Sequence, residues 1–73
     1  MRKDDSTSGP MHERIRRRRE ERGIPAYALA QRLAISPSYV SLIESGKKVP
    51  GEDIARRIAD VLEDDVEMYV AWA

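Results

Sequence analysis

Cysteine is absent from the sequence, which excludes both disulfide bonds and thiolate metal sites. Long apolar runs are also lacking, and no segment resembles a signal peptide or a membrane span. We therefore expect a cytoplasmic protein that makes no contact with a membrane.

Histidine is scarce as well, because His12 is the only one in the chain. No carboxylate pair or nucleophile-base arrangement accompanies it, so the sequence does not favour an enzyme. His12 and Glu13 lack further metal ligands at a suitable spacing, and a solvated helix start explains both residues. We expect neither a metal nor another cofactor.

The chain is short, since its 73 residues form at most one domain. A chain of this size buries only about 60% of the surface that it exposes when unfolded, so its core is marginal. Dimerisation would bury more surface and would help to stabilise such a core.

The sequence has no net charge, yet its charges are unevenly distributed. Residues 1–48 hold eleven Lys and Arg against six Asp and Glu, whereas residues 49–73 hold two against seven. Phosphate is attracted by the local field rather than by the total charge, so the basic part is compatible with nucleic acid. The plainer alternative is that mixed charges only keep a small domain in solution.

The most informative segment lies at residues 28–48, where two short apolar-patterned helices are joined by a tight turn. In the first of these helices, one stripe is apolar and consists of Leu29, Ala30 and Leu33. Gln31 and Arg32 remain in water on the other side. The pattern is typical of a helix-turn-helix.

Ser36 and Pro37 predict the start of the second helix, since a serine hydroxyl caps a free backbone N–H and proline suits the first helical position. Gly46 predicts its end, because this position favours a residue that adopts positive φ at low cost. The recognition helix is therefore expected at residues 37–45. Its inward stripe consists of Val40, Ile43 and Glu44.

These motifs resemble those of the lambda-repressor-like, or xenobiotic-response-element-type, helix-turn-helix family over residues 15–70. The resemblance is carried by Ile15, Arg19, Leu29, Ala30, Ser36, Val40, Ile43, Glu44, Gly46, Lys47, Pro50, Ile54, Ile58, Ala59 and Leu62. It implies an all-α fold, a compact five-helix DNA-binding domain at residues 11–73 with its helix-turn-helix at about residues 25–45. Residues 1–10 are expected to form a disordered N-terminal arm.

The remaining helices have their own signals. A first helix is expected at residues 11–22, ending at Gly23. A fourth helix follows Pro50, with two acidic residues in its first turn, Glu52 and Asp53. It buries Ile54, Ile58, Val61 and Leu62. Either Asp64 or Asp65 caps a fifth helix at about residues 66–72.

The four consecutive arginines at residues 16–19 do not form one basic patch, because successive helical residues point about 100° apart. Arg19 lies only about 40° from the direction of the buried Ile15. The resemblance implies a mostly buried, bidentate ion pair between Arg19 and Glu44, with direct phosphate binding by Arg19 as the alternative. Surface pairs are expected four residues apart, Arg16 with Glu20 and Arg17 with Glu21.

The face of the recognition helix opposite its inward stripe is expected to read bases in the major groove. This face carries Pro37, Ser38, Ser41, Leu42 and Ser45. Contacts to the DNA backbone are expected from Tyr27, Gln31, Ser36, Tyr39, Lys47 and Lys48. The Gln, Asn, Arg or Lys that often reads bases in the family is missing here, so Leu42 is left with apolar contacts such as a thymine methyl group.

Two further family features are absent. Ala34 occupies a turn position usually held by glycine, and Ala26 replaces a polar side chain that commonly contacts phosphate. The fold tolerates both changes, but DNA binding by a single copy should be weak and steeply dependent on salt.

The C-terminal residues are apolar and need a cover. Met68, Tyr69 and Trp72 are therefore candidates for a dimer interface. Alternatively, Met68 and Trp72 close the core of one chain, or the natural C-terminal region of a longer protein is missing.

We therefore expect a sequence-specific transcriptional regulator, a repressor, that reads the major groove of double-stranded DNA as a homodimer. Its two recognition helices would lie one helical turn of DNA apart, about 34 Å. The alternative is a protein-interaction module of the same fold, an antitoxin or a bridging cofactor, whose partner is a protein. The exposed Leu42 and the apolar C-terminus favour that alternative.

Overall fold

The computed structural model describes residues 10–73 and contains five α-helices in that part of the chain. They are α1 (Met11–Glu21), α2 (Ala26–Leu33), α3 (Pro37–Glu44), α4 (Glu52–Leu62) and α5 (Val66–Trp72). The all-α, five-helix expectation is therefore confirmed. The disordered arm expected at residues 1–10 lies outside the described residues except for Pro10, which precedes the first turn of α1.

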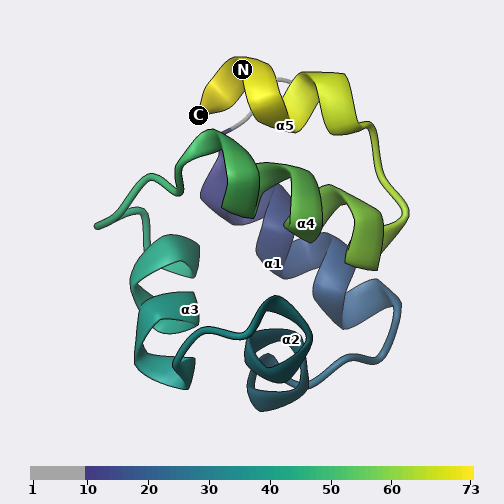
Figure 1. Cartoon of the computed structure of the whole chain (residues 1–73). Helices are drawn as coiled ribbons and strands as arrows, with labels where there is room; N and C mark the ends of the chain where they lie inside the picture. Colours follow the sequence, from purple (N-terminus) through teal and green to yellow (C-terminus); the bar gives the residue numbers. More distant parts are fainter. Residues whose placement is uncertain (1–9) are drawn as a thin grey trace, which may run out of the picture.

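Helix α4 lies at the centre of the arrangement, where it packs against α1, α2 and α5 (Figure 1). Helices α2 and α3 pack against each other at one end of the molecule, and α5 covers the opposite end. Twelve buried residues form the core between these helices: Ile15, Ile24, Leu29, Ala30, Leu33, Val40, Ile43, Ala55, Ile58, Ala59, Leu62 and Tyr69. None of the helices in the described part of the chain combines the length and the apolar character needed to cross a membrane.

The inward stripe of α4 differs from the predicted one. Its buried residues are Ala55, Ile58, Ala59 and Leu62, whereas Ile54 and Val61 are half-buried at the edges of the stripe. Small side chains at the centre allow α4 to approach several helices closely. The apolar spacing identified the correct side of the helix but favoured the larger side chains over the alanines.

The ends of the helices follow the predicted capping chemistry with small shifts. The Ser36 hydroxyl accepts a hydrogen bond from the Tyr39 backbone N–H at 3.1 Å, and Pro37 is the first residue of α3. Asp65, rather than Asp64, caps α5 by accepting from the N–H groups of its second and third residues. Helix α1 ends one residue earlier than expected, before Arg22.

The Asp64 carboxylate joins α1 to α5 instead of capping a helix. It accepts hydrogen bonds from Arg14 Nε at 2.8 Å, Arg14 Nη2 at 2.9 Å and the Tyr69 hydroxyl at 2.8 Å. Arg18 reinforces this contact, because its Nη2 donates to the backbone oxygens of Leu62 and Glu63. The Asp64 side chain is only 8% exposed, so these bonds lie in a largely dry environment.

The Tyr69 side chain is fully buried against this cluster, so its expected role in a dimer interface is wrong. A tyrosine meets both demands of the site, since its ring fills the core and its hydroxyl reaches a carboxylate. Hydrogen bonds from Arg14 hold the pKa of Asp64 well below its usual range, and the Tyr69 hydroxyl adds to the effect. Burial and the neighbouring carboxylate raise the pKa of Tyr69, which keeps the phenol protonated.

We predict that Asp64→Asn destabilises the fold at neutral pH by about 1–3 kcal/mol, because it weakens hydrogen bonds from a charged donor. Since the pKa of Asp64 is lowered on folding, the stabilisation from its charge is fully present above the unfolded value of about 3.9 and is lost as the pH falls below it. Urea unfolding at pH 7 and at pH 2.5 should show a smaller difference between wild type and variant at the lower pH. Asp60→Asn, at an exposed position on α4, is the control, and an equal effect of both changes would contradict the prediction.

Candidate nucleic-acid interface

Helices α2 and α3 form the predicted helix-turn-helix. The turn begins at Ala34, which adopts the left-handed conformation with φ 58°, and the Ile35 N–H returns to the Ala30 oxygen at 3.0 Å. Alanine therefore occupies the position usually given to glycine. Val40 and Ile43 face the core from α3, so the opposite side of that helix is directed outward.

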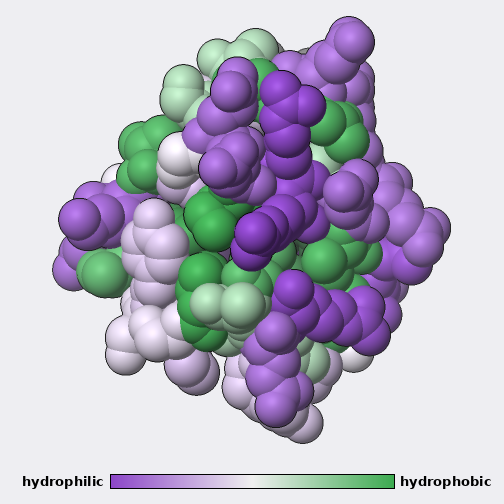
Figure 2. Space-filling view, in the orientation of Figure 1, coloured by the Kyte–Doolittle hydropathy of each residue, from purple (hydrophilic) through white to green (hydrophobic). Residues whose placement is uncertain are grey.

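The outward face of α3 carries the predicted base-reading residues. Pro37, Ser38, Ser41, Leu42 and Ser45 are all exposed, and 37% of Leu42 is accessible. Ser45 lies one residue beyond the end of α3, and its hydroxyl donates to the Leu42 oxygen at 3.1 Å. The region of α3 is pale in Figure 2, which means that it is neither strongly hydrophilic nor strongly hydrophobic.

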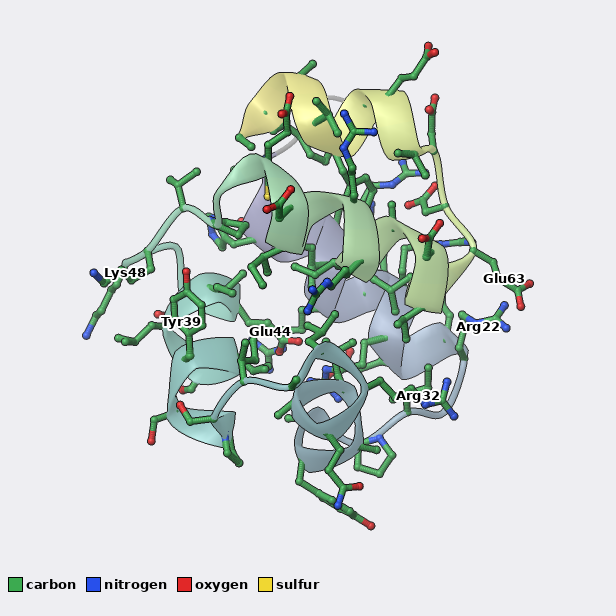
Figure 3. All side chains as sticks on the ribbon, in the orientation of Figure 1. Arg22, Arg32, Tyr39, Glu44, Lys48 and Glu63 are labelled. Atoms are coloured by element: carbon green, nitrogen blue, oxygen red, sulfur yellow. The ribbon has the colours of Figure 1, made fainter. Side chains whose placement is uncertain are left out.

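The residues predicted to contact the DNA backbone surround this face. Tyr27 and Gln31 are exposed on α2, and Lys47 and Lys48 are exposed in the loop after α3. Figure 3 shows Lys48 and Tyr39 on the same side of the molecule, with Lys48 extending outward. Tyr39 is half-buried. Hydroxyl and amide groups are therefore available on α2, before α3, and ammonium groups are available in the loop after α3.

The Arg19–Glu44 ion pair fixes α3 from its inner side. Arg19 Nε donates to Glu44 Oε2 at 2.7 Å and Nη2 donates to Oε1 at 3.0 Å, while Nη1 donates to the Ile24 oxygen at 2.9 Å. The two side chains are only 13% and 10% exposed. The Glu44 hydrogen bonds raise the pKa of Arg19 above its usual value. Because the guanidinium is committed within the fold, the structure disfavours phosphate binding by Arg19.

The other arginines of residues 16–19 are distributed around α1. Arg16 approaches Glu20 at 3.4 Å, as predicted. Glu21, the partner predicted for Arg17, lies 3.6 Å from Arg18. Arg18 points toward the end of α4, as described above, and so has a structural role that sequence reasoning missed. Its position four residues after Arg14 was the available signal, because both lie on one face of the helix.

Gly46 ends the segment that presents α3. Its φ is +81°, and a Cβ at this position would lie 3.0 Å from two ring atoms of His12. The imidazole of α1 therefore packs directly on the backbone after α3. The sequence predicted the positive φ, whereas the contact with His12 depends on how the chain folds back and was missed.

Comparison with known proteins agrees with this geometry. A family model described as a helix-turn-helix domain matches residues 13–68, and the chain belongs to this family. Its fold is that of the lambda-repressor-like domains, a family of DNA-binding regulators rather than enzymes. No curated protein is significantly similar in sequence.

Two solved structures are similar to the chain. The P22 c2 repressor, solved with a synthetic operator, superposes with a TM-score of 0.77 at 23% identity, covering 88% of this chain and 97% of that one. An HTH_3 family transcriptional regulator from Vibrio cholerae superposes with a TM-score of 0.72 at 25% identity. In that case the alignment covers 88% of this chain and 36% of the larger regulator.

We predict that Glu44→Ala lowers the stability by about 3 kcal/mol, because it leaves the Arg19 guanidinium without its partner in a nearly dry site. For a domain of this size, that loss corresponds to a fall in Tm of more than about 10 °C. Thermal unfolding followed by circular dichroism measures it. Glu20→Ala removes an exposed pair and should change the stability by less than about 1 kcal/mol. A fall of only one or two degrees for Glu44→Ala would refute the role given to the pair.

We also predict that three glycine-to-alanine changes destabilise the fold in the order Gly46, Gly23, Gly51. Gly46 and Gly23 both have positive φ, which costs an L residue about 1–2 kcal/mol, but only Gly46 also meets a side chain. Gly51 has neither a positive φ nor a close neighbour. Chemical denaturation of the three variants checks the order. Equal effects at Gly46 and Gly23 would show that the His12 contact adds nothing.

Proposed function

We propose that this chain is a transcriptional repressor domain that binds double-stranded DNA as a homodimer, with α3 in the major groove. The observation that carries the proposal is the exposed outer face of α3, held in place from behind by the Arg19–Glu44 pair. The P22 c2 repressor has the same fold and was solved with an operator, which supports the proposal for this chain.

Base contacts would come from the outer face of α3. Ser38 and Ser41 offer hydroxyl groups that both donate and accept, and the exposed Leu42 offers an apolar surface for a thymine methyl group. The face has no Arg, Lys, Asn or Gln, so it lacks the bidentate pairs that discriminate by about 1–3 kcal/mol each. Specificity would therefore depend on the symmetry and deformability of the operator as well.

Backbone contacts would come from both sides of that face. The lysines after α3 supply the positive charge, whereas Tyr27 and Gln31 on α2 supply polar groups. The Ser36 hydroxyl accepts from Tyr39 N–H in the fold, which leaves its proton free to donate to a phosphate oxygen. Tyr39 lies at the edge of the same surface. Because these contacts neutralise phosphate, affinity should fall strongly as salt is added.

Dimerisation would use the outer side of α5. Met68 and Trp72 are half-buried, so each leaves part of an apolar side chain accessible. The Trp72 ring packs on the buried Tyr69 ring, with centroids 5.5 Å apart, which holds it in place at the surface. Two copies related by a twofold axis would read a pseudo-palindrome with half-sites about 34 Å apart.

A protein partner is the second candidate function. Tyr27, Leu42 and Val49 are the large hydrophobic residues that are exposed in the described part of the chain, and they all lie in α2, α3 or the loop after α3. Such residues would also suit a protein surface. Salt separates the two functions, since phosphate contacts weaken steeply between 50 and 200 mM salt while an apolar interface changes little.

We predict that Ser41→Glu reduces DNA affinity about 100-fold without unfolding the protein, because it places a carboxylate against the base edges and phosphates. Fluorescence anisotropy with a duplex selected from a random pool measures the affinity, and circular dichroism checks the fold. Arg16→Gln, at an exposed position on α1, lowers the net charge by the same one unit and should have little effect. Full affinity of Ser41→Glu would show that this face is not the reader.

A further inference from the structure

A pocket lies beside the recognition helix, between the start of α1, the loop after α3 and the end of α5. Its volume is about 270 Å³. It is lined by Pro10, Met11, His12, Ile43, Gly46, Lys48, Val49, Pro50 and Trp72. Figure 1 shows the C-terminal end of α5 on the same side of the molecule as the loop between α3 and α4. The pocket lies outside the proposed base-reading face, and one of its walls, Trp72, also belongs to the proposed dimer surface.

The walls of the pocket are mostly apolar and are well supported from beneath. Ile43 and Pro50 are buried, so they form a fixed floor. Met11 and Trp72 are half-buried, and Val49 is 67% exposed at the edge. A pocket of this composition suits the apolar part of a small ligand, which would pack between aromatic and aliphatic side chains.

The charge of the lining has one sign. Among the described residues that line the pocket, Lys48 is the charged side chain, His12 is the other polar side chain, and none carries a side-chain carboxylate. Lys48 extends outward from the loop in Figure 3. Because its four-carbon stem is flexible, rotation about it can bring the ammonium to the rim of the pocket. The lining therefore complements a single negative charge next to an apolar group.

The volume limits the size of the ligand. A dry cavity of roughly 150 Å³ holds benzene, so a pocket of about 270 Å³ has room for one ring with a short substituent. One ammonium and one imidazole match the two oxygens of one carboxylate better than they match a phosphate with two charges.

We propose that this pocket binds a small apolar monocarboxylate, with Lys48 pairing with the carboxylate and Trp72 and Val49 packing on its hydrophobic body. Lys48 also belongs to the expected DNA-backbone contacts. A bound carboxylate therefore competes with a DNA phosphate for the same ammonium and weakens DNA binding. The binding of the ligand stands on the pocket alone, whereas this effect on DNA rests on the proposed function.

The test uses phenylacetate as the probe and the fluorescence of Trp72, the only tryptophan in the chain, as the readout. Titration of the full chain without DNA should give a saturable change. Phenylacetamide, which has the same ring without the charge, should bind at least five-fold more weakly. No saturable change, or equal binding of both compounds, overturns the proposal.

Two variants locate the binding. Lys48→Met should weaken phenylacetate binding at least five-fold, and Val49→Glu should weaken it similarly by placing a carboxylate at the rim. Lys47→Met is the matched control, because Lys47 lies on the same loop but not in the lining. Equal effects of the two lysine changes overturn the assignment. Because Lys48 and Val49 are exposed, neither change disturbs the core.

Other occupants give different results. If a second copy of the chain fills the pocket, apparent phenylacetate affinity falls as protein concentration rises, and the proposal is wrong. If residues 1–8 fill it, only a chain that begins at Gly9 binds the probe, which also overturns the proposal. The effect on DNA is a separate measurement, in which DNA affinity is determined with and without phenylacetate. Absence of DNA binding in both cases contradicts the proposed function and leaves the pocket result unchanged.

Discussion

The bidentate contact between Arg19 and Glu44 is the constraint on which the placement of α3 depends. Helix α3 has only eight residues, and it buries Val40 and Ile43 on its inner side. Two buried apolar side chains fix how far a short helix lies from the core. They fix less well how the helix is rotated about its own axis. The planar guanidinium of Arg19 restricts this rotation, because its Nε and Nη2 must meet the two oxygens of one carboxylate. The third donor binds the Ile24 oxygen, so the start of the helix-turn-helix is fixed by the same group.

A second set of charged contacts acts on another face of α1. Asp64 receives hydrogen bonds from Arg14 and Tyr69, while Arg18 binds the last carbonyl groups of α4. Helix α1 thus carries arginines that join it to α3 through one face and to α4 and α5 through another. A core of twelve residues gives little surplus stability in a chain of this length. Ion pairs between mostly buried side chains fix the orientation of the helices relative to one another, which so small a core does not do.

The sequence predicted those features that depend on local chemistry. Ser36, Pro37 and Gly46 each act on the adjacent helical turn, so they predicted the start of α3 at Pro37 and its end to within one residue. The Arg19–Glu44 pair could be expected only because the family resemblance linked two distant positions. The contacts of Asp64 could not be predicted in this way, since Arg14 lies fifty residues away and capping of α5 was an equally good use for the carboxylate. Tyr69 was misplaced for the same reason, because its buried hydroxyl depends on that distant partner.

In the proposed DNA complex, the chemistry of the outer face makes the position of α3 important. A face built from serines and one leucine gains little from any single base pair, so a DNA complex would draw most of its affinity from phosphate contacts. Phosphate contacts carry no sequence information and act by fixing the position of the protein on the duplex. Discrimination then requires that α3 and the flanking lysines keep a fixed relation to each other. The loop from Gly46 to Pro50 maintains that relation, because it is held by His12 on one side and by the buried Pro50 on the other. The pocket adjoins this loop and is lined by Lys48, so a ligand bound there would act on one of these lysines.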